Sequence, residues 1–122
     1  MRLSPRTTRH AVDGGAAVAG RYLAIDSTLV PVMGTVTRLG RSLNADVEID
    51  EPSVSRRHAL IVREDGETWL LDDGSRNGTW HNGIRIDRAL LRDGDHVSLG
   101  VAQLRYVEVV ETPTEPAQLI AV

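Results

Sequence analysis

Three short polar segments of this chain carry side chains that can hold an oxyanion. They are Gly40-Arg41-Ser42, Ser55-Arg56-Arg57-His58 and Gly74-Ser75-Arg76-Asn77-Gly78-Thr79, and short apolar runs separate them. An arginine guanidinium presents its N–H donors in a planar fork that matches the oxygens of a phosphate. A serine hydroxyl adds a donor, and an asparagine amide offers both a donor and an acceptor. A fold that brought these segments together would therefore form a phosphate site.

Several of these residues also have an interpretation without a ligand. Ser55 can cap the backbone of its own turn, and Asn77 followed by glycine is common in ordinary turns. Arg41 can pair with an acid such as Asp46 at the surface. The residue types alone leave both interpretations open.

Catalytic and metal chemistry find no support in the sequence. Ser55 and His58 could be mistaken for part of a hydrolase triad, but the nucleophile elbow Gly-x-Ser-x-Gly is missing. The four histidines lack the spacing of metal ligands. The glycine-rich nucleotide-binding patterns Gly-x-x-x-x-Gly-Lys and Gly-x-Gly-x-x-Gly do not occur. We therefore expect no enzyme activity, no metal and no cofactor.

The composition is that of one small domain with an aliphatic core. The chain has 122 residues, no Phe, two Trp and two Tyr. It has no Cys, no apolar run that approaches the roughly 18 residues of a membrane span, and no apolar centre of a signal peptide near its start. These features lead us to expect a cytoplasmic protein. The net charge of −3 argues against a general nucleic-acid surface, whereas arginines gathered in the three segments favour a small anionic ligand.

Short strands separated by turns must position the three segments. The runs with strand character are Arg21–Asp26, Leu29–Val32, Val36–Leu39, Val47–Ile49, His58–Arg63, Glu67–Leu71, Thr79–His81, Ile84–Ile86, His96–Leu99 and Val101–Val110. Between them, Met33-Gly34, Asp65-Gly66 and Asn82-Gly83 predict hairpin turns. This pattern, without a helical period, predicts an all-β fold, a β-sandwich of about nine to eleven mostly antiparallel strands. The period alone does not distinguish a sandwich from a barrel.

The two ends of the chain have a different character. Residues 1–20 show no sustained period and predict a flexible N-terminal arm. Residues 111–122 contain two prolines and predict a flexible C-terminal tail. Residues 21–110 are then the folded domain.

The motifs and their order resemble the forkhead-associated (FHA) domain, a module that reads phosphothreonine. The resemblance covers about residues 21–110 and rests on Gly40-Arg41, Ser-x-x-His at 55–58, Asn77-Gly78 and Asn82-Gly83. A single such dipeptide would be weak evidence for the family. The four motifs together, in the family's order and at roughly its spacing, are strong evidence. The resemblance implies an FHA/SMAD-like β-sandwich, with the binding loops at one edge, and it identifies the chain as a small stand-alone protein of the bacterial type.

The resemblance also implies which side chains bind phosphothreonine. Arg41 and Ser55 match residues that contact the phosphate, and Arg56 matches a position that presents a further donor. Asn77 matches the residue that hydrogen-bonds the peptide backbone on either side of the phosphothreonine. Arg76 stands where many relatives have a small polar residue, and it is a further candidate for the phosphate.

Other positions match residues that support such a site. Gly40 and Gly78 allow tight backbone turns, and Thr79 follows the second of them. His58 matches a structural histidine whose ring nitrogens tie the binding loops together. Arg57 competes with its neighbour Arg56 for the phosphate, and the sequence leaves that choice open.

The function implied is a phosphothreonine-peptide-binding adaptor in Ser/Thr kinase signalling. Its partner would be a phosphothreonine-containing protein or peptide. The chain itself would bind no nucleic acid and would have no membrane span. One alternative is a phosphate-independent assembly module that uses a sheet face. Another is self-regulation, in which a phosphorylated tail occupies the site. The candidate threonines for the second alternative are Thr7, Thr8, Thr112 and Thr114.

Overall fold

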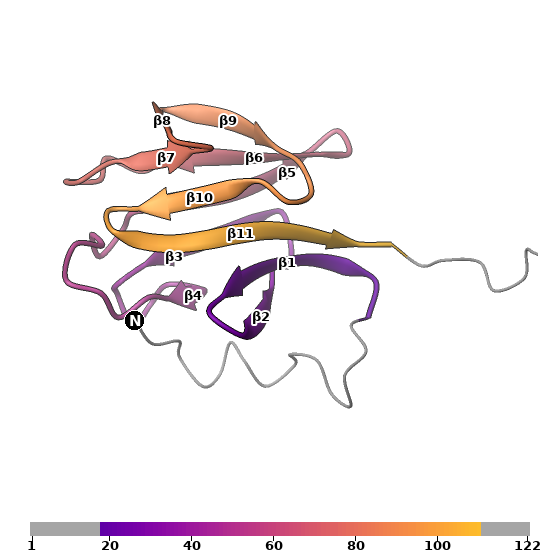
Figure 1. The fold of residues 1–122 in the computed structure, drawn as a ribbon, viewed down its shortest axis with the longest axis horizontal. Helices are drawn as coiled ribbons and strands as arrows, with labels where there is room; N and C mark the ends of the chain where they lie inside the picture. Colours follow the sequence, from indigo (N-terminus) through magenta and orange to yellow (C-terminus); the bar gives the residue numbers. More distant parts are fainter. Residues whose placement is uncertain (1–17, 111–122) are drawn as a thin grey trace, which may run out of the picture.

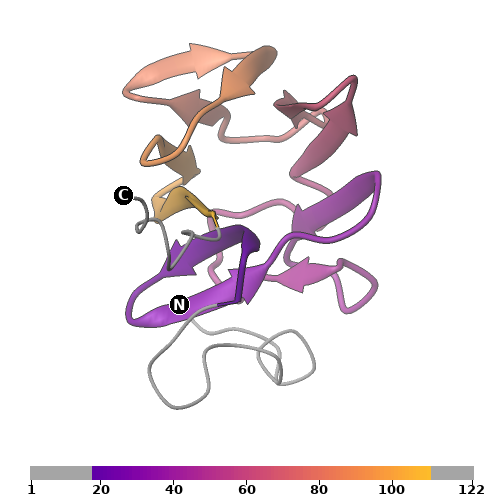
Figure 2. The ribbon, with the colours of Figure 1, turned by 90° about the vertical axis from the view of Figure 1, so that its right-hand side faces the viewer.

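A computed structural model describes residues 18–110, which form two packed β-sheets (Figures 1 and 2). The strands are β1 (Gly20–Ile25), β2 (Thr28–Pro31), β3 (Val36–Gly40), β4 (Val47–Glu48), β5 (Ala59–Glu64), β6 (Glu67–Asp72), β7 (Thr79–His81), β8 (Ile84–Ile86), β9 (Arg88–Leu91), β10 (His96–Leu99) and β11 (Ala102–Val109). The six-stranded sheet has the order β2-β1-β11-β10-β7-β8, and the five-stranded sheet has the order β4-β3-β5-β6-β9. Strands β3 and β4 pair in parallel, and the other recorded pairs in this range are antiparallel. The predicted all-β sandwich is confirmed.

The core lies between the sheets and is aliphatic apart from one tyrosine. Strand β11 shows how the sequence builds it, because Ala102, Leu104 and Tyr106 are buried while Gln103 and Arg105 between them are exposed. Successive side chains of a strand point to opposite faces, so this alternation places one face of the strand in the core. Burying each Val or Leu stabilises the fold by about 1.5–3 kcal/mol.

Two of the predicted hairpin turns are confirmed. Asp65 and Gly66 join β5 to β6, with φ of 54° and 78°. Asn82 and Gly83 join β7 to β8, with φ of 49° and 84°. A two-residue hairpin of this type needs positive φ at both central residues, which Asn, Asp and Gly tolerate.

The predicted hairpin at Met33-Gly34 is wrong. Strand β2 pairs with β1 in the six-stranded sheet, whereas β3 pairs with β4 and β5 in the other sheet. The segment between them is therefore a crossover between the two layers. The chain does turn at Met33-Gly34. Gly34 has a φ of 79°, and the Met33 carbonyl accepts a hydrogen bond of 2.9 Å from the Thr37 hydroxyl. Turn residues reveal a change of direction but not which strands pair.

Strand β9 is missing from the strands that the sequence pattern predicts. It follows β8 after the single residue Asp87, with no Gly or Pro between them. The chain nevertheless changes sheets there, because β8 pairs with β7 and β9 pairs with β6. The Asp87 carbonyl accepts a hydrogen bond of 2.9 Å from the Asp72 amide and so fixes the crossing.

The first and last strands lie side by side, with Gly20 opposite Val109. The predicted arm at 1–20 and tail at 111–122 lie outside the described residues, apart from residues 18–20, the last of which begins β1. Within residues 18–110 there is no helix long and apolar enough to span a bilayer.

The loops that carry the three polar segments meet at one end of the sandwich. The β3–β4, β4–β5 and β6–β7 loops and the β10–β11 turn all lie at the left of Figure 1. Backbone hydrogen bonds join them: the Arg41 amide donates to the Ser55 carbonyl at 3.0 Å, and the Gly100 amide donates to the Gly78 carbonyl at 3.1 Å.

Candidate functional site

Arg41 is held at the base of its side chain and free at the tip. Its Nε donates a hydrogen bond of 2.9 Å to the Val54 carbonyl in the β4–β5 loop. Within residues 18–110 the two Nη nitrogens have no recorded hydrogen bond or ion pair, and the side chain is exposed. The predicted alternative partner Asp46 instead accepts from the Arg38 amide at 2.8 Å. The tip of Arg41 can therefore receive an external anion.

Gly40 is needed because two loops approach each other closely there. A Cβ at this position would lie 2.0 Å from the Arg56 carbonyl oxygen and 3.0 Å from that of Ser55. Real Cβ atoms do not come so close, so a larger residue would force the β4–β5 loop away. The glycine thus sets the distance between Arg41 and the next polar segment.

Ser55 links the β4–β5 loop to the β6–β7 loop. Its Oγ accepts a hydrogen bond of 2.9 Å from the Arg76 amide. The hydroxyl hydrogen stays available for a second partner, because a serine hydroxyl both donates and accepts. The predicted role of Ser55 as a donor to phosphate is compatible with this geometry.

His58 is a fully buried brace between the same loops. Its Nδ1 accepts a hydrogen bond of 2.9 Å from the Ser55 amide, so the proton must be on Nε2. Nε2 then donates to the Gly78 carbonyl at 2.8 Å. Burial lowers the pKa of His58, and the Gly78 carbonyl and the charge of Asp72 offset this only in part. A neutral ring with both nitrogens engaged inside the protein is a structural group.

The turn at Gly78 is crowded by side chains that the sequence does not single out. Gly78 has a φ of 91°, and a Cβ there would lie 2.8 Å from Nε of Arg85 and 3.0 Å from Nε1 of Trp80. The Trp80 indole is also 3.5 Å from the Asn77 carbonyl. The hairpin signal at Asn82-Gly83 could have identified Trp80 and Arg85, because a two-residue turn there makes them register partners on β7 and β8.

Asp72 organises the β6–β7 loop, although its sequence context suggested only a turn residue. Its carboxylate accepts hydrogen bonds from the Gly74 amide, from the amide and hydroxyl of Ser75, and from the buried Thr79 hydroxyl at 2.6 Å. Burial by itself raises the pKa of Asp72, but the bonds from Ser75, Thr79 and Gly74 outweigh it and hold the pKa below its usual value. The spacing Asp-x-x-Ser-x-x-x-Thr is the signal that could have indicated this network.

Asn77 lies at the tip of that loop and is exposed. Its Nδ2 donates a hydrogen bond of 2.8 Å to the Ser53 carbonyl. The Ser53 hydroxyl in turn accepts from the Val101 amide at 2.9 Å, so the β10–β11 turn supports the amide from behind. The amide oxygen of Asn77 has no recorded partner within residues 18–110 and can accept from a peptide N–H.

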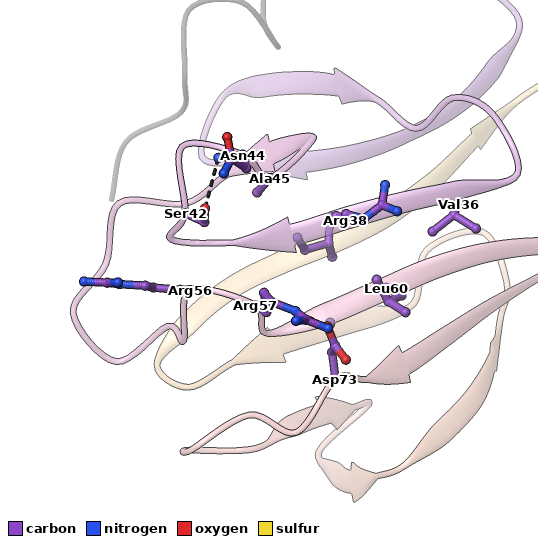
Figure 3. A pocket seen from close by; sticks show the side chains of 11 residues that line it. Val36, Arg38, Ser42, Asn44, Ala45, Arg56, Arg57, Leu60 and Asp73 are labelled. Atoms are coloured by element: carbon purple, nitrogen blue, oxygen red, sulfur yellow. Dashed lines mark hydrogen bonds and ion pairs between the residues drawn. The ribbon is translucent and has the colours of Figure 1, made fainter.

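The remaining arginines divide between two places. The side chains of Arg56 and Arg76 are exposed and make no recorded hydrogen bond or ion pair within residues 18–110. Arg57 instead points along the sheet to Asp73, with 3.4 Å between Nε and Oδ2, while Arg56 points away from it (Figure 3). The geometry thus favours Arg56 over Arg57 as a phosphate ligand. Among the described residues, no group of His, Asp and Glu is arranged to hold a metal ion.

Known proteins resemble this chain in sequence. The model of the FHA domain matches residues 37–100, more than half of the chain. An ABC transporter ATP-binding/permease protein of Mycobacterium tuberculosis is 44% identical over 71 residues, which are 58% of this chain and 8% of the transporter. The glycogen accumulation regulator GarA of Mycolicibacterium smegmatis is 41% identical over 71 residues, which are 58% of this chain and 45% of GarA. The match therefore spans less than half of each of these relatives.

A solved structure described as part of a study of phosphothreonine-dependent FHA domain interactions has the same fold. It superposes with a TM-score of 0.71 and 26% identity, and the alignment covers 75% of this chain and 98% of that one. The matched range spans Gly40-Arg41, Ser55 to His58 and Asn77-Gly78, the residues of the candidate site. The chain belongs to the FHA domain family.

Proposed function

We propose that this protein is a phosphothreonine-peptide-binding adaptor that acts in Ser/Thr kinase signalling. Arg41, Ser55, Arg56 and Arg76 bind the phosphate, and Asn77 binds the peptide backbone. A phosphothreonine carries a charge of about −1.5 to −2 and three acceptor oxygens at neutral pH. It can therefore use several charge-assisted donors at once.

One observation carries the proposal. The free tip of Arg41 comes from a side chain already fixed at Nε, and the Ser55 hydroxyl is already fixed by the Arg76 amide. Donors from two loops are thus held in place before any ligand arrives. A preformed site loses little conformational entropy on binding, and charge-assisted hydrogen bonds are the stronger kind.

The relatives support the same class of function. The solved structure named above concerns phosphothreonine-dependent FHA interactions, and GarA is named a regulator of glycogen accumulation. We infer that this chain likewise binds a phosphorylated partner without catalysing a reaction, and that it does so in the cytoplasm. The donors described here hold and orient an anion; the His58 ring nitrogens, which could otherwise move a proton, are both occupied.

The test is a titration by fluorescence anisotropy with three degenerate peptide pools. One pool contains phosphothreonine, one phosphoserine and one unmodified threonine. Arg41→Ala is the site variant, and Arg92→Ala removes an exposed positive charge elsewhere as the matched control. We expect the phosphothreonine pool alone to bind, and Arg41→Ala to weaken it about tenfold to hundredfold. Equal binding of all pools, or full binding by Arg41→Ala, would refute the proposal.

A further inference from the structure

An open groove of about 500 Å³ lies on the outer face of the five-stranded sheet, over β3 and β5 (Figure 3). Its apolar lining includes Val36, Ala45 and Leu60, and its charged lining includes Arg38 and Arg57. Arg38 and Leu60 are register partners on neighbouring strands, so they stand side by side on this face. The groove therefore combines an aliphatic floor with a basic rim.

The groove is continuous with the phosphate-binding loops. Ser42 and Arg56 both line it, and they directly follow Arg41 and Ser55 in the chain. Neighbouring Cα atoms are about 3.8 Å apart, so the groove opens within one residue of the proposed phosphate ligands. A peptide anchored by its phosphothreonine can enter it without leaving the protein surface.

The charges of the groove favour an acidic occupant. Arg38 and Arg57 line it against the single acid Asp73, and the third arginine of the lining, Arg56, is assigned to the phosphate by the proposed function. Arg57 and Asp73 are 3.4 Å apart with the Arg57 side chain 83% exposed, and Arg38 is 3.8 Å from Asp46 with its side chain 64% exposed. Exposed ion pairs of this kind contribute little, so both guanidiniums can turn to an external carboxylate at small cost.

We propose that this groove binds the segment that flanks the phosphothreonine in the same partner, where that segment carries an aliphatic side chain next to a carboxylate. The aliphatic side chain packs on Leu60 and Val36, and the carboxylate forms an ion pair with Arg57 or Arg38. The proposal rests on the proposed function, because the phosphothreonine supplies the anchor. The attached segment then binds at a high effective concentration, which raises affinity without a strong contact of its own.

The length of the groove sets the length of that segment. From Gly40 to Val36, strand β3 spans about 13 Å at about 3.3 Å per residue. An extended peptide advances about 3.3–3.6 Å per residue, so the occupant needs about four residues beyond the phosphothreonine. A peptide with shorter flanks should bind only the loops.

The experiment compares short and long phosphothreonine peptides by titration of the ¹⁵N-labelled protein in NMR. The short peptide has about two residues on each side of the phosphothreonine, and the long ones add about six residues with a Glu-Leu pair on one flank or the other. Amide shifts at Arg41, Ser55 and Asn77 report the proposed function. Amide shifts at Val36 and Leu60 report the groove, so failure of one is distinguishable from failure of the other.

We expect one of the long peptides to shift Val36 and Leu60 and to bind about tenfold more tightly than the short one. Arg57→Glu and Arg38→Glu should abolish that gain and leave the affinity for the short peptide within about twofold. Arg92→Glu, an exposed charge reversal outside the groove, should leave the gain intact. Loss of the gain in Arg92→Glu would mean a general charge effect and overturn the proposal.

Two other outcomes would also overturn it. If neither long peptide shifts Val36 and Leu60 while the loop amides still respond, the groove does not take the flanking segment. If the same two amides shift with protein concentration alone, the occupant is a second copy of this chain. A further peptide with Lys-Ser in place of Glu-Leu should show no gain, because it offers neither the carboxylate nor the aliphatic side chain.

Discussion

The buried ring of His58 joins two loops by donating a hydrogen bond of 2.8 Å to the Gly78 carbonyl. The same ring accepts from the Ser55 amide at 2.9 Å, so one side chain fixes a proposed phosphate donor relative to the turn that carries Asn77. The spacing of the peptide-binding residues is thus a property of the folded domain. Stability and binding should therefore be coupled at this residue.

Replacing His58 by alanine should destabilise the domain by about 3 kcal/mol or more. The change leaves a cavity in a fully buried place, removes the partner of the Ser55 amide, and leaves the Gly78 carbonyl with the Gly100 amide alone. Urea unfolding followed by tryptophan fluorescence measures this loss of stability. His81→Ala, at a partly exposed histidine that pairs with Asp95, is the comparison and should cost clearly less. Equal losses would contradict the bracing role.

The pKa of His58 should also make stability depend on pH. Burial lowers the folded-state pKa below the usual 6.5, so the unfolded chain binds this proton first as the pH falls. The contribution of the neutral ring is complete above pH 6.5 and declines below that value, until the folded-state pKa is reached. The measurement is the free energy of unfolding from pH 7.5 downward, and the decline should be shallower in His58→Gln. An unchanged slope in that variant would assign the effect to another group.

Gly40→Ala should weaken phosphopeptide binding strongly. Its Cβ would meet the Arg56 carbonyl at 2.0 Å, so the β4–β5 loop must move and carry Ser55 with it. Gly34→Ala is a suitable control, because no atom lies within 4 Å of a Cβ there. The control strains a φ of 79° and should lose about 1 kcal/mol of stability with no change in affinity. Isothermal titration with a phosphothreonine peptide, together with urea unfolding, separates the two effects.

The neighbours Asp72 and Asp73 should respond differently to the same change. Asp72→Asn disturbs a carboxylate that accepts from Ser75, Thr79 and Gly74, and it should cost about 2 kcal/mol and weaken binding through the β6–β7 loop. Asp73→Asn loses only an ion pair with the exposed Arg57 and should stay within about 0.5 kcal/mol. The measurement is the midpoint of urea unfolding of each variant. Comparable losses would mean that the hydrogen bonds to Asp72 contribute little.

Acid should expose the role of Asp72 in a separate pH range. Its folded-state pKa lies below the usual 3.8, so its stabilising contribution is complete above that value and is lost as the pH falls through the folded-state pKa. Unfolding curves of the wild type and Asp72→Asn should therefore converge below pH 3.8. Curves that keep a constant separation would argue that Asp72 acts by shape alone.

Much of this fold and site follows from local chemistry in the sequence. The Asp65-Gly66 and Asn82-Gly83 hairpins follow from their backbone preferences, and the alternation in Val101–Val110 identifies a half-buried strand. The order of the polar loops indicated Arg41, Ser55 and Asn77. Their meeting at one end of the sandwich is a matter of topology, which local preferences do not encode.

What the sequence did not reveal depends on distant contacts. The crossover at Met33 has the residues of a hairpin turn, and the β8–β9 connection through Asp87 has no turn signal. Asp72 has the composition of an ordinary turn, and its importance lies in hydrogen bonds to residues up to Thr79. The orientation of Arg57 toward Asp73 likewise depends on which strand follows which in the sheet.

The antiparallel pairing of β1 with β11 also determines how the domain can be built into larger proteins. Gly20 and Val109 are register partners, and β11 spans its eight residues from the Gly100 turn at the loop end to the opposite end. The start of β1 and the end of β11 therefore lie at the side remote from the β3–β4 and β6–β7 loops (Figure 1). A surface tether or neighbouring domain joined directly before Gly20 or after Val109 would therefore start on the side away from these loops. Immobilisation through a tether placed directly before Gly20 or after Val109 should consequently give the same affinity as measurement in free solution.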